Sequence, residues 1–342
     1  MDIKFTRSNG QIDTLIDQLI DQVGVHHPHI IREMVLSALK VGHDNDYLAD
    51  LKLIRTTMKE MRYTSKVFSP YRSRKKVTIF GSARTKPHQP IYQKCVHFAR
   101  LLVEHNYMII TGGGGGIMQA GNEGAGEENS FAINIELPFE QSTNAVMEAS
   151  DRVLMYKYFF NRKVAFLKEA DAIALFPGGF GTMDEAMEAM TLLQTGKNPP
   201  IPLVLIDDDK ETYWEQWLEL LRNTMLAKGL ICGEDFGLFT ITRSIDEAFD
   251  VIHSFYKIYH SSRYVDNRLV IRLTKALQPE QIETLEHEFS KILLPGTHIK
   301  TVSAFEKEKD QPDLWHLPRL AIEFDRRSYG LLNSFIRRIN SF

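Results

Sequence analysis

Three glycine-rich segments, each directly after a short apolar run, constrain the fold of this chain more than any other feature. They are "FGSAR" (80–84), "TGGGGGIMQAGNEGAG" (111–126) and "PGGFGT" (177–182), preceded by "VTIF", "YMIIT" and "AIALF". Two further short, mostly apolar runs, "FAINIEL" (131–137) and "PLVLI" (202–206), are also strand candidates. Helical patterns separate most of these candidate strands. Strands that alternate with helices predict a parallel sheet covered on both faces.

The rest of the chain is organised around this core. Its 342 residues exceed one usual domain. Residues 1–69 carry apolar side chains at three- and four-residue spacing, which predicts helices. Residues 70–262 are expected to form an α/β core, a Rossmann-like doubly wound parallel sheet. Residues 263–342 show strands and helices in the order βαββα, which predicts a small α+β domain with three strands.

Composition and charge argue against several classes of protein. The net charge of -3 gives no general attraction to nucleic acid or anionic membranes, and "YRSRKK" (71–76) is interpreted as a solvated linker. No apolar run has the length of about 18 residues that a membrane span requires, and the N-terminus lacks the apolar region of a signal peptide. The two cysteines, Cys95 and Cys232, cannot build a disulfide scaffold and suit a reducing cytosol. The histidines of "HHPHI" (26–30) lack the spacing of a helical zinc pair. These features predict a cytoplasmic protein with no nucleic-acid partner, no membrane partner, no metal and no cofactor.

The glycine segments predict an anion site. Glycine allows the backbone to approach a ligand closely, and a helix N-terminus offers free N–H groups with a partial positive charge. Because the C-terminal ends of parallel strands share one edge of a sheet, the three loops should meet in one crevice. The usual nucleotide fingerprints are absent: no G-x-G-x-x-G can be placed within 112–126, and no G-x-x-x-x-G-K-[ST] occurs. The sequence therefore argues against a standard dehydrogenase and a P-loop ATPase.

Glu185 follows the third glycine loop, and its role has two interpretations. Thr182 with Glu185 three residues later matches the capping box T-x-x-E, in which the carboxylate would only cap the helix. Alternatively, Glu185 faces the ligand, because the helix begins at the ligand edge of the sheet.

Arg162 and Lys163 lie on the predicted helix before the third loop, next to Tyr158, Phe159 and Phe160. They form either a solvated basic face or a contact to phosphate or sugar, with a base placed among the aromatic side chains.

With "PGGFGTMDE" (177–185), "FFNRK" (159–163) and "TGGGGGIM" (111–118), the sequence resembles the LOG (Lonely Guy) family of cytokinin-activating phosphoribohydrolases and related bacterial nucleotide 5'-monophosphate nucleosidases. The motif P-G-G-x-G-T-x-x-E is complete, and the resemblance covers residues 70–260. Members are often labelled lysine decarboxylases, but the sequence shows no site for pyridoxal phosphate.

The resemblance implies hydrolysis of a nucleoside 5'-monophosphate to free base and ribose 5-phosphate. Cytokinin riboside monophosphates would be among the substrates. It assigns catalysis to Glu185 and Arg162. Substrate and phosphate binding falls to Ser82, Arg84, Gly113, Gly114, Gly115, Met118, Lys163, Gly178, Gly179, Gly181 and Thr182. The carboxylate would stabilise the positive charge that develops on the sugar, while the glycine loops hold the phosphate. Separately, the small C-terminal module has edge strands that invite pairing with another chain, so we expect a homo-oligomer, at least a dimer.

A non-catalytic nucleotide- or cofactor-binding carrier on the same scaffold is the main alternative. Such a carrier would retain the glycine loops without needing Glu185 and Arg162 together. A DNA-associated protein with a similar core is disfavoured by the net charge.

Overall fold

The computed structural model describes residues 3–136, 143–210 and 212–342. The chain divides into two compact units, one ending at Tyr63 and one from Thr64 to Phe342. The first unit contains α1 (Gln11–Val23), α2 (Pro28–Asp44) and most of α3 (Leu48–Phe68), so the predicted helices are confirmed. Its small core is built on Ile16, Ile20 and Leu36, and a buried ion pair joins Arg32 to Asp13.

A seven-stranded sheet forms the centre of the second unit, and all its strand pairs are parallel. The strand order is β4-β3-β2-β1-β5-β6-β7. The strands are β1 (Lys76–Phe80), β2 (Met108–Thr111), β3 (Ser130–Ile135), β4 (Val153–Tyr156), β5 (Ala172–Leu175), β6 (Leu203–Ile206) and β7 (Thr240–Thr242). The five predicted strands are confirmed, although the last residue predicted for β3, at position 137, lies outside the described residues. The sequence did not predict β4, an apolar run of four residues (VLMY) with no glycine-rich loop after it, or β7, which has only three residues, two of them threonine.

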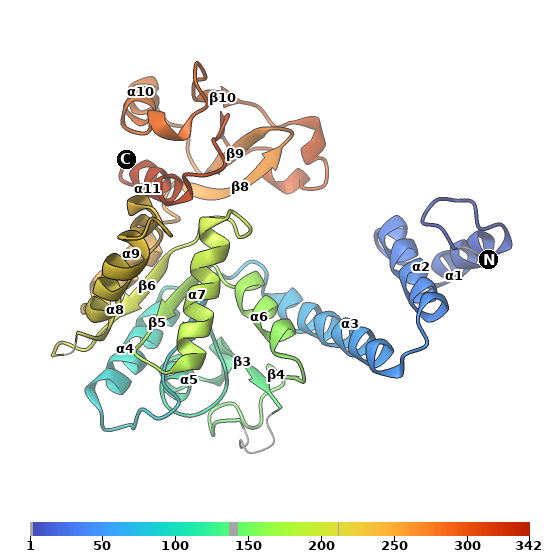
Figure 1. Cartoon of the computed structure of the whole chain (residues 1–342), viewed down its shortest axis with the longest axis horizontal. Helices are drawn as coiled ribbons and strands as arrows, with labels where there is room; N and C mark the ends of the chain where they lie inside the picture. The colour runs from blue at the N-terminus through green and yellow to red at the C-terminus, as the bar shows by residue number, and fades with distance from the viewer. Residues whose placement is uncertain (1–2, 137–142, 211) are drawn as a thin grey trace. The chain divides into compact units, whose positions relative to one another are not determined.

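Helices cover both faces of this sheet, as the doubly wound prediction requires (Figure 1). One face packs against α6 (Phe159–Lys168), α7 (Phe180–Gln194) and α8 (Tyr213–Leu221). The other face packs against α4 (Pro90–Glu104), α5 (Ile117–Ala125) and α9 (Ile245–Ser254). Side chains alternate between the two cores along each strand: Ile173 and Leu175 of β5 enter the first core, Ala172 and Ala174 the second. Both faces of the sheet are thus buried. Groups that bind a ligand are therefore expected at the edge of the sheet where its strands end.

The C-terminal part has a four-stranded antiparallel sheet in the order β10-β11-β9-β8. Its elements are β8 (Tyr259–Val265), β9 (Arg268–Leu273), α10 (Pro279–Glu288), β10 (Lys300–Val302), β11 (Arg319–Ile322) and α11 (Tyr329–Asn340). The predicted α+β character is confirmed, but the order βαββα is wrong because it omits β8. That strand runs across the predicted boundary between residues 262 and 263. Its mostly polar, half-exposed sequence shows no apolar run, and a hairpin to β9 holds it in place.

Short helical turns complete the chain. They are η1 (Ser69–Tyr71), η2 (Glu127–Asn129), the π-helical η3 (Arg222–Leu226), η4 (Gly233–Leu238), η5 (Ser290–Ile292), η6 (Glu306–Glu308) and η7 (Pro312–Leu314). Helix α11 packs closely on η4: a Cβ atom at Gly330 would lie 2.0 Å from the carbonyl oxygen of Glu234. The Asn333 side chain also donates a hydrogen bond of 2.8 Å to the Gly237 carbonyl. The small sheet is thereby attached to the core.

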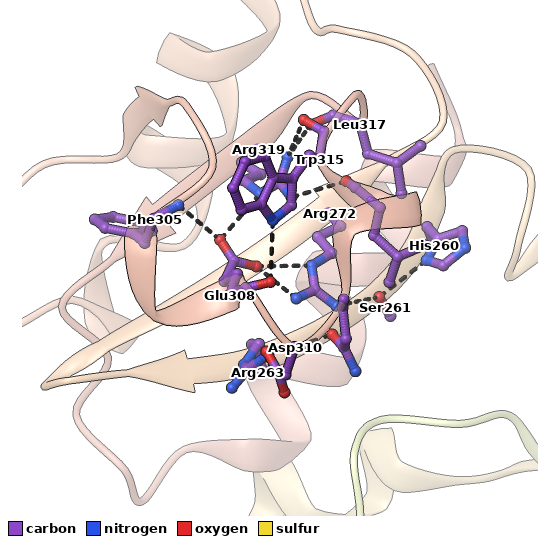
Figure 2. Close-up of polar contacts among 12 residues, drawn as sticks. His260, Ser261, Arg263, Arg272, Phe305, Glu308, Asp310, Trp315, Leu317 and Arg319 are labelled. Atoms are coloured by element: carbon purple, nitrogen blue, oxygen red, sulfur yellow. Dashed lines mark hydrogen bonds and ion pairs between the residues drawn. The ribbon is translucent and has the colours of Figure 1, made fainter. Parts of the chain in front are cut away.

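Figure 2 shows a buried charge network in the C-terminal part, centred on the fully buried Glu308 of η6. One of its carboxylate oxygens accepts hydrogen bonds from Nε and Nη2 of Arg272, at 3.0 and 2.5 Å. The other accepts from Nε of Arg319 at 3.3 Å and from the backbone N–H of Phe305 at 3.0 Å. Although burial alone would raise the pKa of Glu308, these bonds and the two guanidinium charges hold it below its ordinary value.

Candidate functional site

The candidate site lies where the strand order of the large sheet reverses. From β1 the chain proceeds outward through β2, β3 and β4, and then returns to β5 on the other side of β1. The loops that follow β1 and β5 therefore diverge and leave a crevice, which is the usual ligand position in open α/β sheets. A cavity of about 720 Å³ lies there. Its size is typical of small-molecule sites.

All three glycine-rich loops contribute to this cavity. Of the predicted site residues, its lining contains Ser82, Arg84, Met118, Arg162, Gly178, Gly179, Gly181, Thr182 and Glu185. The second loop contributes Gly112 and Met118, whereas Gly113, Gly114 and Gly115 lie outside the lining. Gly113 lies outside the lining because its backbone makes local hydrogen bonds. Its N–H donates to Thr111 Oγ1, and its carbonyl accepts from the N–H of Asn144. The binding roles of Gly113, Gly114 and Gly115 stay predictions.

The third loop approaches the first so closely that only glycine fits at position 178. A Cβ atom there would lie 2.1 Å from Thr182 Oγ1 and 2.9 Å from the backbone nitrogen of Ser82. The same loop is fixed by Tyr213 of α8, whose hydroxyl donates a hydrogen bond of 2.6 Å to the Gly178 carbonyl. The phosphate-loop candidate is therefore held by contacts from two other segments of the core.

Helix α7 begins at Phe180, and Gly179 occupies the N-cap position. Among the described residues no side chain caps this end. The capping-box interpretation of Thr182 and Glu185 is therefore wrong, since Thr182 lies inside the helix and Glu185 nearly a turn beyond it. The first N–H groups of α7 point from the helix end that borders the cavity, where they favour an anion.

Glu185 is buried, with 3% of its surface exposed, and it lines the cavity. Its Oε2 atom has no hydrogen-bond partner within the described parts of the chain. Burial raises the pKa of this carboxyl to about 7, and the positive charges of Lys163 and Arg162 limit the rise. A buried carboxyl group that has an oxygen without a hydrogen bond, and a pKa raised to near neutral pH, is typical of catalytic acids and bases.

Lys163 does not line the cavity. Its ammonium group lies 2.8 Å from Asp184 Oδ2 and 2.6 Å from Glu188 Oε2, and 3.9 Å from Glu185 Oε2. Burial works against the charged form of Lys163, but the hydrogen bonds to Asp184 and Glu188 raise its pKa above the ordinary value. The predicted contact of Lys163 with substrate stays a prediction.

Arg162 lies on the cavity wall beside two aromatic rings of its own helix. Its guanidinium carbon is 5.3 Å from the ring centre of Phe159 and 5.4 Å from that of Phe166. Such cation–π contacts restrain the guanidinium, and its positive charge favours the ionised form of Glu185. Phe159 and Phe160 themselves are about half exposed and are not among the lining residues.

Sequence reasoning missed several lining residues: Phe80, Gly81, Ala83, Gly112, Phe166, Phe180, Met183 and Tyr213. Phe180 is 94% exposed at the first position of α7 and offers an open aromatic face. Tyr213 could have been found, because it follows β6, which also ends at the ligand edge. Phe166 points inward from a helix with no such positional clue.

In the parts of the chain that the structure describes, no cluster of three or more potential metal ligands is present. Nor does any helix there combine the length and apolar character needed to cross a membrane.

Known proteins resemble the core of this chain. Residues 118–252 match the family model described as "Possible lysine decarboxylase". The cytokinin riboside 5'-monophosphate phosphoribohydrolase LOG7 of Arabidopsis thaliana is 28% identical over 141 residues, which cover 39% of this chain and 62% of that protein. A probable enzyme of the same name from Oryza sativa subsp. japonica, LOGL2, is 28% identical over 159 residues, 44% of this chain and 63% of the relative. These matches confirm the resemblance to the LOG family, and each spans less than two thirds of the relative.

A solved structure also resembles the chain. The molybdenum cofactor binding protein of Rippkaea orientalis is 20% identical and matches with a TM-score of 0.37, over 52% of this chain and 94% of that one. A likeness at this level has no bearing on function.

Proposed function

We propose that this protein hydrolyses the N-glycosidic bond of nucleoside 5'-monophosphates, converting nucleotide and water to free base and ribose 5-phosphate. The observation that carries the proposal is one cavity that combines an uncapped helix N-terminus with a buried carboxyl group. That carboxyl group, on Glu185, has an oxygen without a hydrogen-bond partner among the described residues. An anion site and a free carboxylate suit opposite ends of the same substrate. The names of the relatives agree with this reaction.

Each part of the substrate has a matching group in the cavity. The 5'-phosphate would lie at the N–H groups that open α7, where the helix dipole favours negative charge. Arg162 would bind phosphate or sugar; because a guanidinium group holds its proton very strongly, it is a poor proton donor. Phe180 would stack on the base, and such stacking tolerates many bases, including those of cytokinin riboside monophosphates.

The ionised form of Glu185 would perform the main chemical role. Cleavage of the glycosidic bond leaves positive charge on the ribose ring, and a carboxylate fixed beside the ring stabilises that charge. The same oxygen could accept a proton from the attacking water. Both roles require the deprotonated carboxyl, so kcat/KM should rise with pH through the pKa of about 7.

The decisive experiment is a panel of nucleoside monophosphates with assays for released base and for ribose 5-phosphate, repeated with the unphosphorylated nucleosides. Hydrolysis confined to the phosphorylated compounds is expected. Equal kcat/KM for the two sets would contradict the assignment of a binding site for the 5'-phosphate. Binding of a nucleotide without release of base, measured by calorimetry, would favour the carrier alternative, which needs the loops but has no use for the carboxylate.

We also propose that the protein is a cytoplasmic homo-oligomer, at least a dimer, and that residues 1–69 and 263–342 assemble or regulate a catalytic core at 70–262. Exposed apolar side chains on β4 and α6 (Met155, Phe159, Phe160 and Val164) support a self-association surface. Two unpaired cysteines suit the cytoplasm. Light scattering on the full chain tests the assembly, and a monomer at micromolar concentration would contradict it.

A further inference from the structure

Three charged side chains surround Glu185 without touching the cavity. Lys163 of α6 forms close ion pairs with Asp184 and Glu188, which lie on either side of Glu185 along α7. The two carboxylates are partly exposed, with 58% and 31% of their side-chain surfaces accessible, whereas Lys163 retains 17%. The lysine is therefore held in one position by two anchors on the neighbouring helix.

This position leaves Lys163 close to Glu185 but outside hydrogen-bonding distance. Its Nζ atom is 3.9 Å from Glu185 Oε2, the oxygen that has no hydrogen-bond partner among the described residues. At that separation the ammonium attracts the carboxylate through space, while the oxygen's lone pairs stay available to a ligand. A direct hydrogen bond would occupy one of these lone pairs and stabilise the ionised form further.

We propose that Lys163, anchored by Asp184 and Glu188, is a positioning residue that sets the charge around Glu185 while leaving its reactive oxygen free. The inference rests on the proposed nucleosidase function and reassigns Lys163 from substrate contact to this role. It also explains why acidic residues follow a phosphate loop. Asp184 and Glu188 restrain the lysine, and only Glu185 faces the cavity.

Other charged or titratable groups lie around the same cavity. Arg162, from α6, adds a second positive charge that favours its ionised form. Arg84, from the loop after β1, and Tyr213, from α8, line the same cavity. These groups are unchanged in the variants below, so any shift between variants reports on Lys163 and its two anchors.

Two variants should move the ionisation of Glu185 in opposite directions. Lys163→Met removes a positive charge and should move the acidic limb of kcat/KM to higher pH, by about one unit. The double variant Asp184→Asn with Glu188→Gln removes two negative charges and frees Lys163 to bond Glu185. It should move the limb to lower pH, by a similar amount of about one unit. Lys168→Met is the matched control, because Lys168 ends the same helix, pairs with Glu169 and is absent from the cavity lining.

The same shifts can be followed without catalysis. Carbon-13 NMR titration of labelled glutamate carboxyls, assigned by the loss of one resonance in Glu185→Gln, reports the ionisation of Glu185 in each variant. Opposite shifts in the NMR titration support the proposal even if no hydrolysis is found, in which case only the proposed function fails. Shifts of the same sign in both variants, or an unmoved Glu185 resonance, would overturn the role of Lys163.

Discussion

Glu185 and Glu308 are the two buried glutamates in the described parts of the chain, and they occupy opposite kinds of environment. Every oxygen of the Glu308 carboxylate accepts hydrogen bonds, from two arginines and a backbone N–H (Figure 2). Glu185 faces a cavity, its Oε2 atom has no such partner among those residues, and its pKa rises to about 7 because of burial. A buried carboxylate whose oxygens all accept hydrogen bonds is typical of a structural network, whereas one with an oxygen left without a hydrogen bond costs stability and is a candidate for chemistry.

The largest effect should come from replacing Glu308, the glutamate whose oxygens all accept hydrogen bonds. Glu308→Gln leaves two buried guanidinium groups without a counter-charge and should lower the free energy of unfolding by about 3–5 kcal/mol. Chemical denaturation followed by circular dichroism measures it. Glu306→Gln is the control, since this glutamate of the same turn is 81% exposed and its replacement should change stability by less than about 0.5 kcal/mol. Equal stability of the two variants would show that the network contributes little.

The largest effect on activity should come from replacing Glu185. Glu185→Gln removes the charge but keeps the shape, and should lower kcat at least about a hundredfold, or roughly 3 kcal/mol, while nucleotide binding persists. Released base and calorimetric affinity are the two measurements. Glu219→Gln, on the exposed face of α8, should retain full turnover. Near-normal turnover in Glu185→Gln would reduce this glutamate to a packing residue.

The pH dependence of stability sharpens the contrast, because the two carboxyls shift in opposite directions. Glu185 keeps its proton in the folded state up to about pH 7 but loses it near the ordinary 4.5 when unfolded. Stability therefore falls as pH rises across this interval, and Glu185→Gln should exceed the wild type at pH 8 by on the order of 1–3 kcal/mol. For Glu308, whose folded pKa is lowered, stability is present above the unfolded pKa and lost as pH falls. Unfolding curves at pH 4 and pH 8 test this; a Glu185→Gln variant that is less stable at pH 8 would contradict it.

The smallest effect concerns the loop beside Glu185. Tyr213→Phe removes the hydrogen bond to the Gly178 carbonyl and should raise KM about fivefold, corresponding to roughly 1 kcal/mol, with a smaller change in kcat. Steady-state kinetics with a nucleoside monophosphate measure both constants. Tyr92→Phe, which loses a hydrogen bond to Glu123 outside the cavity lining, is the control. A kcat loss as large as that of Glu185→Gln would mean that the loop affects the catalytic step as well as substrate binding.

The sequence by itself determined the parallel α/β class, five of the seven strands of the large sheet and the place of the candidate site. Apolar runs followed by glycines identified β1, β2 and β5, and parallel strands bring their C-terminal ends to one edge whatever the details of packing. Ser82, Gly178 and Thr182 could be assigned to one cavity on that ground alone. The strands β7 and β8 escaped prediction because their mostly polar sequences become strands only through their pairing partners, whereas the apolar run of β4, VLMY, is not followed by the glycines that marked β1, β2 and β5.

Only the tertiary structure decided what the charged residues do. Glu185 fitted a helix cap equally well until α7 was seen to begin at Phe180. Lys163 resembled a ligand contact in sequence, and its pairing with Asp184 and Glu188 depends on how α6 lies against α7. Glu308 of η6 meets Arg272 of β9 and Arg319 of β11, with nothing in its local sequence to indicate burial. Periodicity and glycine placement are local properties of the chain, whereas the charge state of a side chain depends on neighbours that only folding brings near.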